Sequence, residues 1–265
     1  MNKAFSLFVA LSLICSVAPA AAKSSISRGG FGFLYQDTNH FANPALFSQL
    51  RGFSFAGDFY KNIDAEEVTA NSSAILGNGR VGLGVFAERK GYVLNDPEDS
   101  TDSAGVGFGF NFAKNMANVG VEYSRSVDAA APTDGTVSAT FTYQPSGKGF
   151  SIGAGGSTTI NGDTDVRSAI GALGYAFSPM VQLEGTFSFP DITNVNDWIT
   201  GGFLNVTGRI LYVTSGFTYW TSYMTQTMMA RVGFVIGNTV DISGYGTKVL
   251  GAPSYSYGAN FRFRI

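Results

Sequence analysis

The stretch Val106–Phe112, Val-Gly-Phe-Gly-Phe-Asn-Phe, alternates strictly between apolar residues and small or polar residues. Successive side chains of a β-strand point to opposite faces, so this pattern gives one apolar face and one small or polar face. The same period of two recurs along the chain, at 81–87, 119–124, 137–143 and 181–189. The sequence therefore predicts an all-β protein built from many strands of this kind.

Three features favour a transmembrane β-barrel over a soluble exported β-sandwich, which remains the alternative. The runs are about ten residues long, the length of a tilted strand that crosses a bilayer. The second face carries Gly, Ser, Thr and Asn, and only 14% of the 265 residues are charged, where roughly 25% is usual. Aromatic rings flank the runs, as expected at the headgroup level: Tyr60, Tyr92, Tyr143, Tyr175, Phe177, Trp198 and Trp220.

Residues 1–22 have the three parts of a secretory signal peptide. A positive start at Lys3 precedes the apolar run 4–17, and 20–22 are alanines that suit cleavage. The run is too short to span a bilayer. Its removal takes away Cys15, the single cysteine, so the mature chain has no disulfide. An exported chain without a second long apolar stretch is secreted, periplasmic or a β-barrel of the outer membrane of a Gram-negative bacterium.

The predicted barrel occupies 50–265 and closes from about fourteen antiparallel strands in up-and-down order. The runs at 67–76 and 198–207 alternate least clearly, and without them the count is twelve. Tight connections alternate with longer ones, which predicts short periplasmic turns and external loops. The external loops hold most of the 19 acidic residues, as solvated charge or as sites where divalent cations bridge to lipopolysaccharide. The fourteen predicted strands are 50–60, 67–76, 79–90, 103–112, 117–126, 135–144, 149–159, 167–177, 180–189, 198–207, 209–220, 225–236, 239–247 and 254–265.

The last strand carries a second signal, with Tyr257, Phe261, Phe263 and Ile265 on one face. This ending resembles the C-terminal β-signal through which the assembly machinery of the outer membrane recognises its substrates. Members usually end in Phe, so the terminal Ile is a departure. The alternation itself directs the apolar residues to lipid and three polar ones, Asn260, Arg262 and Arg264, to the lumen.

Residues 23–49 are too long for a turn, and Pro44 excludes a central strand position. The segment is predicted to enter the lumen as a plug, beside inward-facing glycines. Its Asn43-Pro44-Ala45 resembles the FadL-like transporters of hydrophobic compounds and their PorV-like relatives. The resemblance implies fourteen strands, an N-terminal hatch and hydrophobic cargo. This chain is shorter than a typical FadL, lacks the Gly that usually follows Asn-Pro-Ala, and has no long external loops.

Catalytic chemistry is not expected. The single histidine, His40, lies outside every predicted strand, so a Ser-His-acid or Asp-His site has no rigid support. No cysteine remains after the signal and no histidine pair exists, which argues against zinc. The glycines at 105, 107 and 109 repeat every two residues and form no dinucleotide motif. The prediction is no enzyme, no cofactor, no metal and no nucleic-acid partner.

The alternation of strand positions assigns one group of charged residues to the lumen and another to the outer wall. Inward positions carry seven candidate lumen-lining residues. Their opposed charges set a transverse field in a pore, or Arg231, Arg262 and Arg264 either pair with Glu122, Glu184 and Asp241 or clamp the plug. Outward positions carry Arg89, Arg125 and Arg167 at the predicted external rim, where they either contact lipopolysaccharide phosphates or simply snorkel. The lumen-lining candidates are Asp58, Glu122, Glu184, Arg231, Asp241, Arg262 and Arg264.

The sequence thus predicts a passive outer-membrane channel for small molecules, with hydrophobic cargo if the FadL-like resemblance holds. The alternative is a non-conducting structural or scaffolding barrel, including a homo-oligomeric one.

Overall fold

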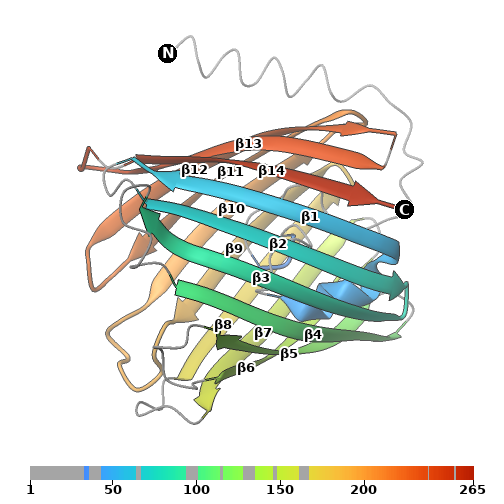
Figure 1. Cartoon of the computed structure of the whole chain (residues 1–265), viewed down its shortest axis with the longest axis horizontal. Coiled ribbons are helices and arrows are strands. Elements are labelled where there is room, and N and C mark those ends of the chain that lie inside the picture. Colours follow the sequence, from blue (N-terminus) through green and yellow to red (C-terminus); the bar gives the residue numbers. More distant parts are fainter. Residues whose placement is uncertain are drawn as a thin grey trace.

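A computed structural model describes residues 33–35, 43–63, 67–93, 101–113, 116–127, 135–145, 148–160, 167–237, 239–253 and 255–265. The fold consists of one short 3-10 helix and fourteen strands (Figure 1). No helix in these ranges has the length and apolar character needed to cross a membrane. The elements are η1 (Pro44–Gln49), β1 (Arg51–Asn62), β2 (Glu67–Asn78), β3 (Val81–Val93), β4 (Thr101–Ala113), β5 (Ala117–Ser126), β6 (Gly135–Tyr143), β7 (Gly149–Ile160), β8 (Arg167–Ser178), β9 (Val181–Phe189), β10 (Ile199–Thr207), β11 (Leu211–Trp220), β12 (Thr225–Ile236), β13 (Val240–Val249) and β14 (Tyr255–Arg264).

The strands form one closed barrel in which every strand pairs antiparallel with its sequence neighbours, and β1 pairs with β14. The closing register places Phe55 opposite Phe263 and Tyr60 opposite Gly258. Closure removes every open sheet edge, as a strand structure inside a bilayer requires. The predicted fourteen-strand barrel is confirmed, and the twelve-strand count and the soluble sandwich are not what the chain forms.

The two least regular runs, β2 and β10, alternate weakly because each has apolar residues on both faces. In β2 the apolar Ile75 faces inward and packs against Phe47 and Leu50, so apolar residues are not confined to the outer face of this strand. In β10 the side chain of Phe203 also points inward and is buried. Apolar residues on both faces weaken the alternation without preventing strand pairing.

The connections differ between the two ends of the barrel. One end, here called the turn rim, has tight connections such as Asn78–Val81, where the Asn78 side chain accepts hydrogen bonds from the N–H groups of Arg80 and Val81. Gly79 takes a φ of +82° there, which a glycine adopts without strain. The other end, the loop rim, carries the longer connections. The prediction assigns the turn rim to the periplasm and the loop rim to the cell exterior.

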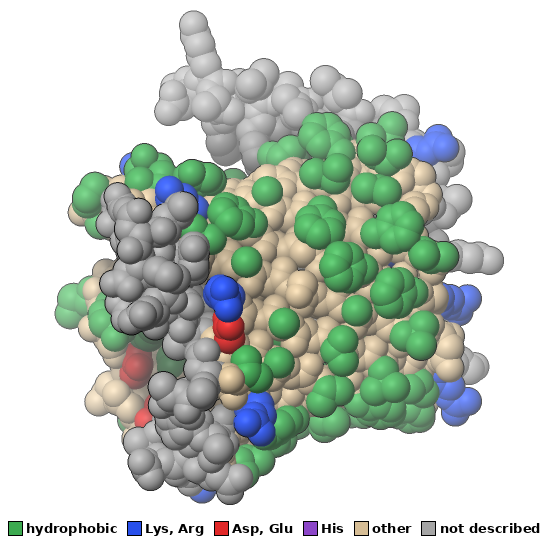
Figure 2. All heavy atoms as spheres, in the orientation of Figure 1, with side chains coloured by type: hydrophobic (Ala, Val, Ile, Leu, Met, Phe, Trp, Pro, Cys, Tyr) green, Lys and Arg blue, Asp and Glu red, His purple; other side chains and the backbone are tan. Residues whose placement is uncertain are grey.

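The outer wall is apolar between the rims. Figure 2 shows hydrophobic side chains spread over the visible wall, with most Lys and Arg side chains towards its two ends. Among the flanking aromatic rings, Trp198 stacks on Phe187 at 5.4 Å. The assignment of Tyr60 to this outer ring is wrong: it faces the lumen, stacks on Tyr245 at 6.2 Å and donates a hydrogen bond to Ser256 Oγ.

Burial of the inward side chains changes along most strands. On β7, Ser151 near the turn rim is buried, whereas Ser157 nearer the loop rim is half-buried. On β13, Asp241 is buried and Thr247 is half-buried. The lumen is therefore packed in its turn-rim half and more open in its loop-rim half.

Candidate functional site: the barrel lumen

The helix η1 lies inside the barrel against β2, β3, β4, β5 and β6 (Figure 1). The Ala45 N–H donates to Thr140 Oγ1 at 3.1 Å, and Ser48 Oγ donates to Asn118 Oδ1 at 2.8 Å. A Cβ built on the inward Gly120 would lie 2.2 Å from Ala45 N. The small inward residues of this wall are what admit the helix.

A second contact anchors residues 33–35. The Glu184 carboxylate of β9 accepts hydrogen bonds from the backbone N–H groups of Phe33 at 2.5 Å, Leu34 at 3.0 and 3.1 Å, and Tyr35 at 3.1 Å. Three successive N–H groups around one carboxylate form an anion-binding nest made of charge-assisted bonds. The Glu184 side chain therefore holds this piece of chain against the lumen wall.

One further hydrogen bond links the two described pieces of the N-terminal segment, and two others join residues 34 and 35 to the barrel. Asn43 Nδ2 donates to Phe33 O at 2.7 Å, Tyr35 Oη lies 2.9 Å from Ser151 Oγ, and Gln144 Nε2 donates to Leu34 O. Asn43, Pro44 and Ala45 are all buried. The remaining predicted plug, 23–32 and 36–42 with His40, and the predicted signal peptide lie outside the described residues, so the plug as a whole stays a prediction.

The wall formed by β12, β13, β14 and β1 carries long charged side chains instead. Arg262 donates through one guanidinium nitrogen to Asp241 Oδ2 at 2.5 Å, and Tyr212 Oη donates to Asp241 Oδ1 at 2.7 Å. The two side chains of this ion pair are 1% and 6% exposed. Arg231 lies 4.9 Å from the ring centroid of Tyr245, whose hydroxyl donates to Asp58 Oδ2 at 3.0 Å. The buried charges of Arg262 and Asp241 are compensated by their ion pair and by the Tyr212 hydrogen bond, as desolvation requires.

All seven lumen-lining candidates occupy inward positions. Some of the predicted pairs between them form and others do not. Arg262 pairs with Asp241, and Arg264 is half-buried at the turn-rim end of β14. The predicted pairing of Glu184 with an arginine is wrong, because backbone N–H groups take all its described hydrogen bonds. Glu122 is half-buried and makes no ion pair with any described residue.

Glu122 and Arg231 lie on opposite sides of the lumen. Strands β5 and β12 are seven places apart in the ring of fourteen, which is half the circumference. Glu122 is the sixth residue of β5 counted from the turn rim, and Arg231 is the sixth of β12 counted from the same rim. A carboxylate and a guanidinium thus face the lumen at the same level from opposite walls.

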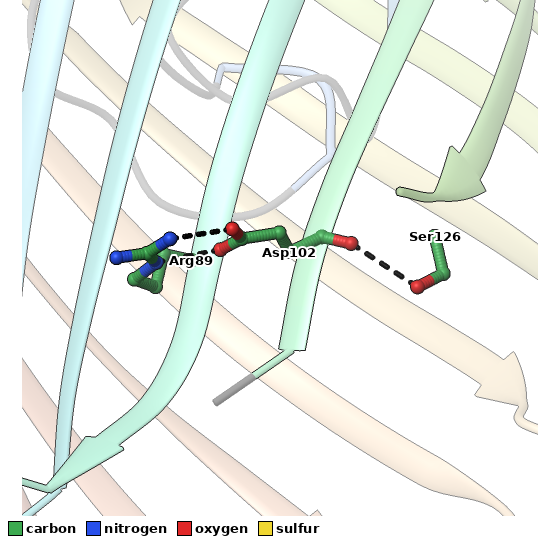
Figure 3. Close-up of polar contacts among 3 residues, drawn as sticks. All are labelled: Arg89, Asp102 and Ser126. Atoms are coloured by element: carbon green, nitrogen blue, oxygen red, sulfur yellow. Dashed lines mark hydrogen bonds and ion pairs between the residues drawn. The ribbon is translucent and has the colours of Figure 1, made fainter. Parts of the chain in front are cut away.

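On the outer wall, Arg89 and Asp102 form a second ion pair, between β3 and β4 near the loop rim (Figure 3). Arg89 Nε lies 2.7 Å from Asp102 Oδ1 and a terminal nitrogen 2.6 Å from Oδ2. The Asp102 carbonyl accepts from the Ser126 hydroxyl of β5 at 3.2 Å. Sequence reasoning placed Asp102 in a loop, whereas it faces outward on a strand.

Arg125 and Arg167 also take outward, exposed positions at the loop rim. Arg125 Nε donates to Ser126 O at 3.4 Å. Contact of these arginines with lipopolysaccharide stays a prediction.

The C-terminal strand has the predicted faces. Tyr257, Phe261, Phe263 and Ile265 are exposed on the outer wall, while Asn260 and Arg262 are buried inside. Recognition of this strand by the assembly machinery stays a prediction. Within the described ranges, no group of three His, Cys, Asp or Glu side chains is placed to hold a metal ion.

Comparison with known proteins finds no matching family model and no matching curated protein. Solved structures do match. The Acinetobacter baumannii outer membrane protein Omp33 aligns with 12% identity and a TM-score of 0.57, over 82% of this chain and all of that chain, 100%. A triple mutant of the Rhodopseudomonas blastica porin aligns with 8% identity and a TM-score of 0.52, over 80% of this chain and 99% of that chain.

A third match is a structure described as "Asymmetric conductivity of engineered proteins", with 9% identity, a TM-score of 0.51, and coverage of 81% of this chain and 98% of that chain. At these identities the likeness shows the fold. The protein is a closed fourteen-strand β-barrel, a fold that it shares with these outer-membrane proteins.

Proposed function

We propose that this barrel is a passive outer-membrane channel for small polar molecules, narrowed by its N-terminal segment. The single observation that carries the proposal is the placement of Glu122 and Arg231 at one level on opposite lumen walls. Opposed acidic and basic side chains set a transverse field that orients and selects polar solutes.

The cargo class follows from the wall on which a solute would move. The inward positions of β12, β13 and β14 carry Arg231, Asp241, Ser243, Asn260 and Arg262. These groups are at most 4% exposed, so a solute reaches them only once the lumen opens, and a hydrophobic solute would then give them no hydrogen bonds. The wall thus favours polar cargo over the hydrophobic cargo that the FadL-like resemblance implies.

Planar-bilayer recording tests the channel directly. The purified full chain is expected to give stable single-channel steps with a measurable preference between K⁺ and Cl⁻. Glu122→Gln is expected to shift the reversal potential in a KCl gradient towards anion selectivity, because it removes the carboxylate and leaves Arg231 in place. Absence of steps at high protein load would contradict the proposal.

A second candidate function, a non-conducting scaffold, draws support from one observation. The inward side chains of the turn-rim half are closed to water, with Glu184, Arg231 and Arg262 each about 1% exposed. Passage therefore requires the N-terminal segment to shift. If Glu184→Gln is as silent as the wild type in bilayers, the scaffold is the better account.

The orientation of the barrel is part of the same proposal. We place the turn rim in the periplasm and the loop rim outside, so that Arg89, Arg125 and Arg167 lie at the headgroups of the outer leaflet. A biotin acceptor tag inserted in the 190–197 connection is expected to be labelled on intact cells.

A further inference from the structure

The outer wall of strands β10 to β14 carries a groove of about 790 Å³. Its volume is within the range of roughly 300–1,000 Å³ usual for small-molecule sites. Two neighbouring rows of outward side chains line it, and the backbone of the inward row between them forms its floor. The outward residues are Leu204, Ser215, Ala230, Gly246 and Tyr257 in one row, and Gly202, Phe217, Met228, Lys248 and Tyr255 in the other.

The groove exists because small residues are clustered there among large ones. Ser215, Ala230 and Gly246 carry little or no side chain, whereas Phe217 and Met228 stand 54% and 53% exposed beside them and the Phe217 ring lies over Gly202. A Cβ on Gly246 would meet only the Ser256 carbonyl oxygen, at 3.6 Å. No neighbouring side chain therefore covers the outer side of Gly246.

The two ends of the groove differ in chemistry. Lys248 is the second-last residue of β13 and Tyr255 is the first of β14, so both lie at the loop rim. At the other end, Leu183 is the third residue of β9 from the turn rim. The groove therefore descends obliquely from a cation at the rim to apolar side chains deep in the wall.

Among the described residues of strands β9 to β14, Lys248 has no acidic neighbour on the outer wall. The two acids of these strands, Glu184 and Asp241, both face the lumen. Lys248 is also the one cation at an outward position of these described strands. An anion at the loop rim would complete the charge balance, in contrast to Arg89, whose charge Asp102 already balances.

We propose that the groove binds one anionic, phosphate-bearing lipid, with its phosphate beside Lys248 and an acyl chain along the groove. The groove faces hydrocarbon, so its filling must be apolar. Lys248 at one end of the groove, with Lys61 of β1 opposite Tyr257 as a second outward cation beside it, matches the polarity of an anionic lipid. A second copy of this barrel would bring a second Lys248 and no acid to balance it. The proposal rests on the outer-membrane fold and not on conductance.

Native mass spectrometry of the full chain in neutral detergent tests this, with phosphatidylglycerol and phosphatidylcholine as the probe lipids. Wild-type barrel is expected to retain phosphatidylglycerol more tightly. Lys248→Gln should weaken that binding about fivefold, the effect of one cation near an anionic headgroup, and should leave phosphatidylcholine unchanged. Gly246→Leu should weaken both lipids, because it fills the groove.

Two matched controls keep the result specific. Arg89→Gln removes a cation that is already paired, and Gly171→Leu adds the same side chain at an outward glycine away from the groove, where a Cβ meets only Phe187 O at 4.0 Å. Both should bind like the wild type, and slow mobility of unboiled samples confirms that each variant is folded. Equal phosphatidylglycerol binding by wild type and Lys248→Gln would overturn the proposal. So would a wild-type dimer that Gly246→Leu dissociates, because a second copy would then occupy the groove.

Discussion

The two sides of the lumen are filled in different ways. The β2–β6 wall has small inward residues such as Gly120, and a separate piece of chain, η1, lies on it. The wall from β12 to β14 fills its own space with Tyr245, Arg231 and Arg262. The same strand alternation thus supports either a docked segment or a network of buried charges, and the size of the inward residue decides which.

The largest expected effect concerns the buried ion pair. Asp241→Ala leaves the guanidinium of Arg262 buried without its carboxylate, which typically costs about 3–5 kcal/mol. We expect a marked fall in the urea midpoint of unfolding from lipid vesicles. The double variant Asp241→Ala with Arg262→Met should recover most of the loss, and no recovery would mean that the pair is not what stabilises this wall.

The next effect tests the docked segment. Gly120→Leu forces a side chain into the space taken by Ala45, and such overpacking costs about 1–3 kcal/mol or displaces the segment. Ser48→Cys, which replaces a buried side chain, reports displacement as faster maleimide labelling in a chain whose other cysteine, Cys15, is changed to serine. Unchanged labelling and stability would show that this wall does not hold η1. Gly171→Leu, at an outward glycine, is the control.

A smaller effect on stability is expected from Glu184→Gln, which tests whether the Glu184 carboxylate holds the N-terminal segment. Glu184→Gln keeps one carbonyl oxygen but turns an NH₂ group towards the three backbone N–H donors, and it loses charge-assisted bonds worth roughly 1.5–3 kcal/mol each to a buried partner. Much of this loss is recovered if the segment leaves the wall, so the expected readout is faster labelling of Ser48→Cys with little change in barrel unfolding. Equal labelling rates would mean that η1 is held without Glu184.

The smallest effect is expected at the exposed pair. Arg89 and Asp102 have the same chemistry and nearly the same separation as Arg262 and Asp241, but their side chains are 53% and 28% exposed. Water and headgroups solvate them, so Arg89→Gln should leave the urea midpoint within experimental error. A loss as large as that of Asp241→Ala would contradict the view that burial sets the difference.

Much of the barrel could be predicted from local pattern. The period of two predicted the fourteen strands, and β5 and β12 match their predicted ranges. Parity also predicted the inward side of Asp58 and Arg231, because side-chain direction in a strand depends only on position.

The contacts within the lumen were beyond such reasoning. Glu184 meets Leu34 across 150 residues of chain, and no spacing in the sequence links them. Tyr60 was assigned to the headgroup ring because aromatic residues at strand ends usually face lipid, whereas here its inward parity prevails. The groove could not be predicted because it depends on the register between neighbouring strands, which places Gly246 opposite Ala230.

Single-channel recording of the wild type beside Glu184→Gln tests the central claim most directly. The account predicts discrete steps for the wild type and a larger or more persistent open state for Glu184→Gln, because it takes the N-terminal segment, anchored through residues 33–35 by that carboxylate, to narrow the lumen. Silence from both proteins, in preparations whose gel mobility shows a folded barrel, would contradict it.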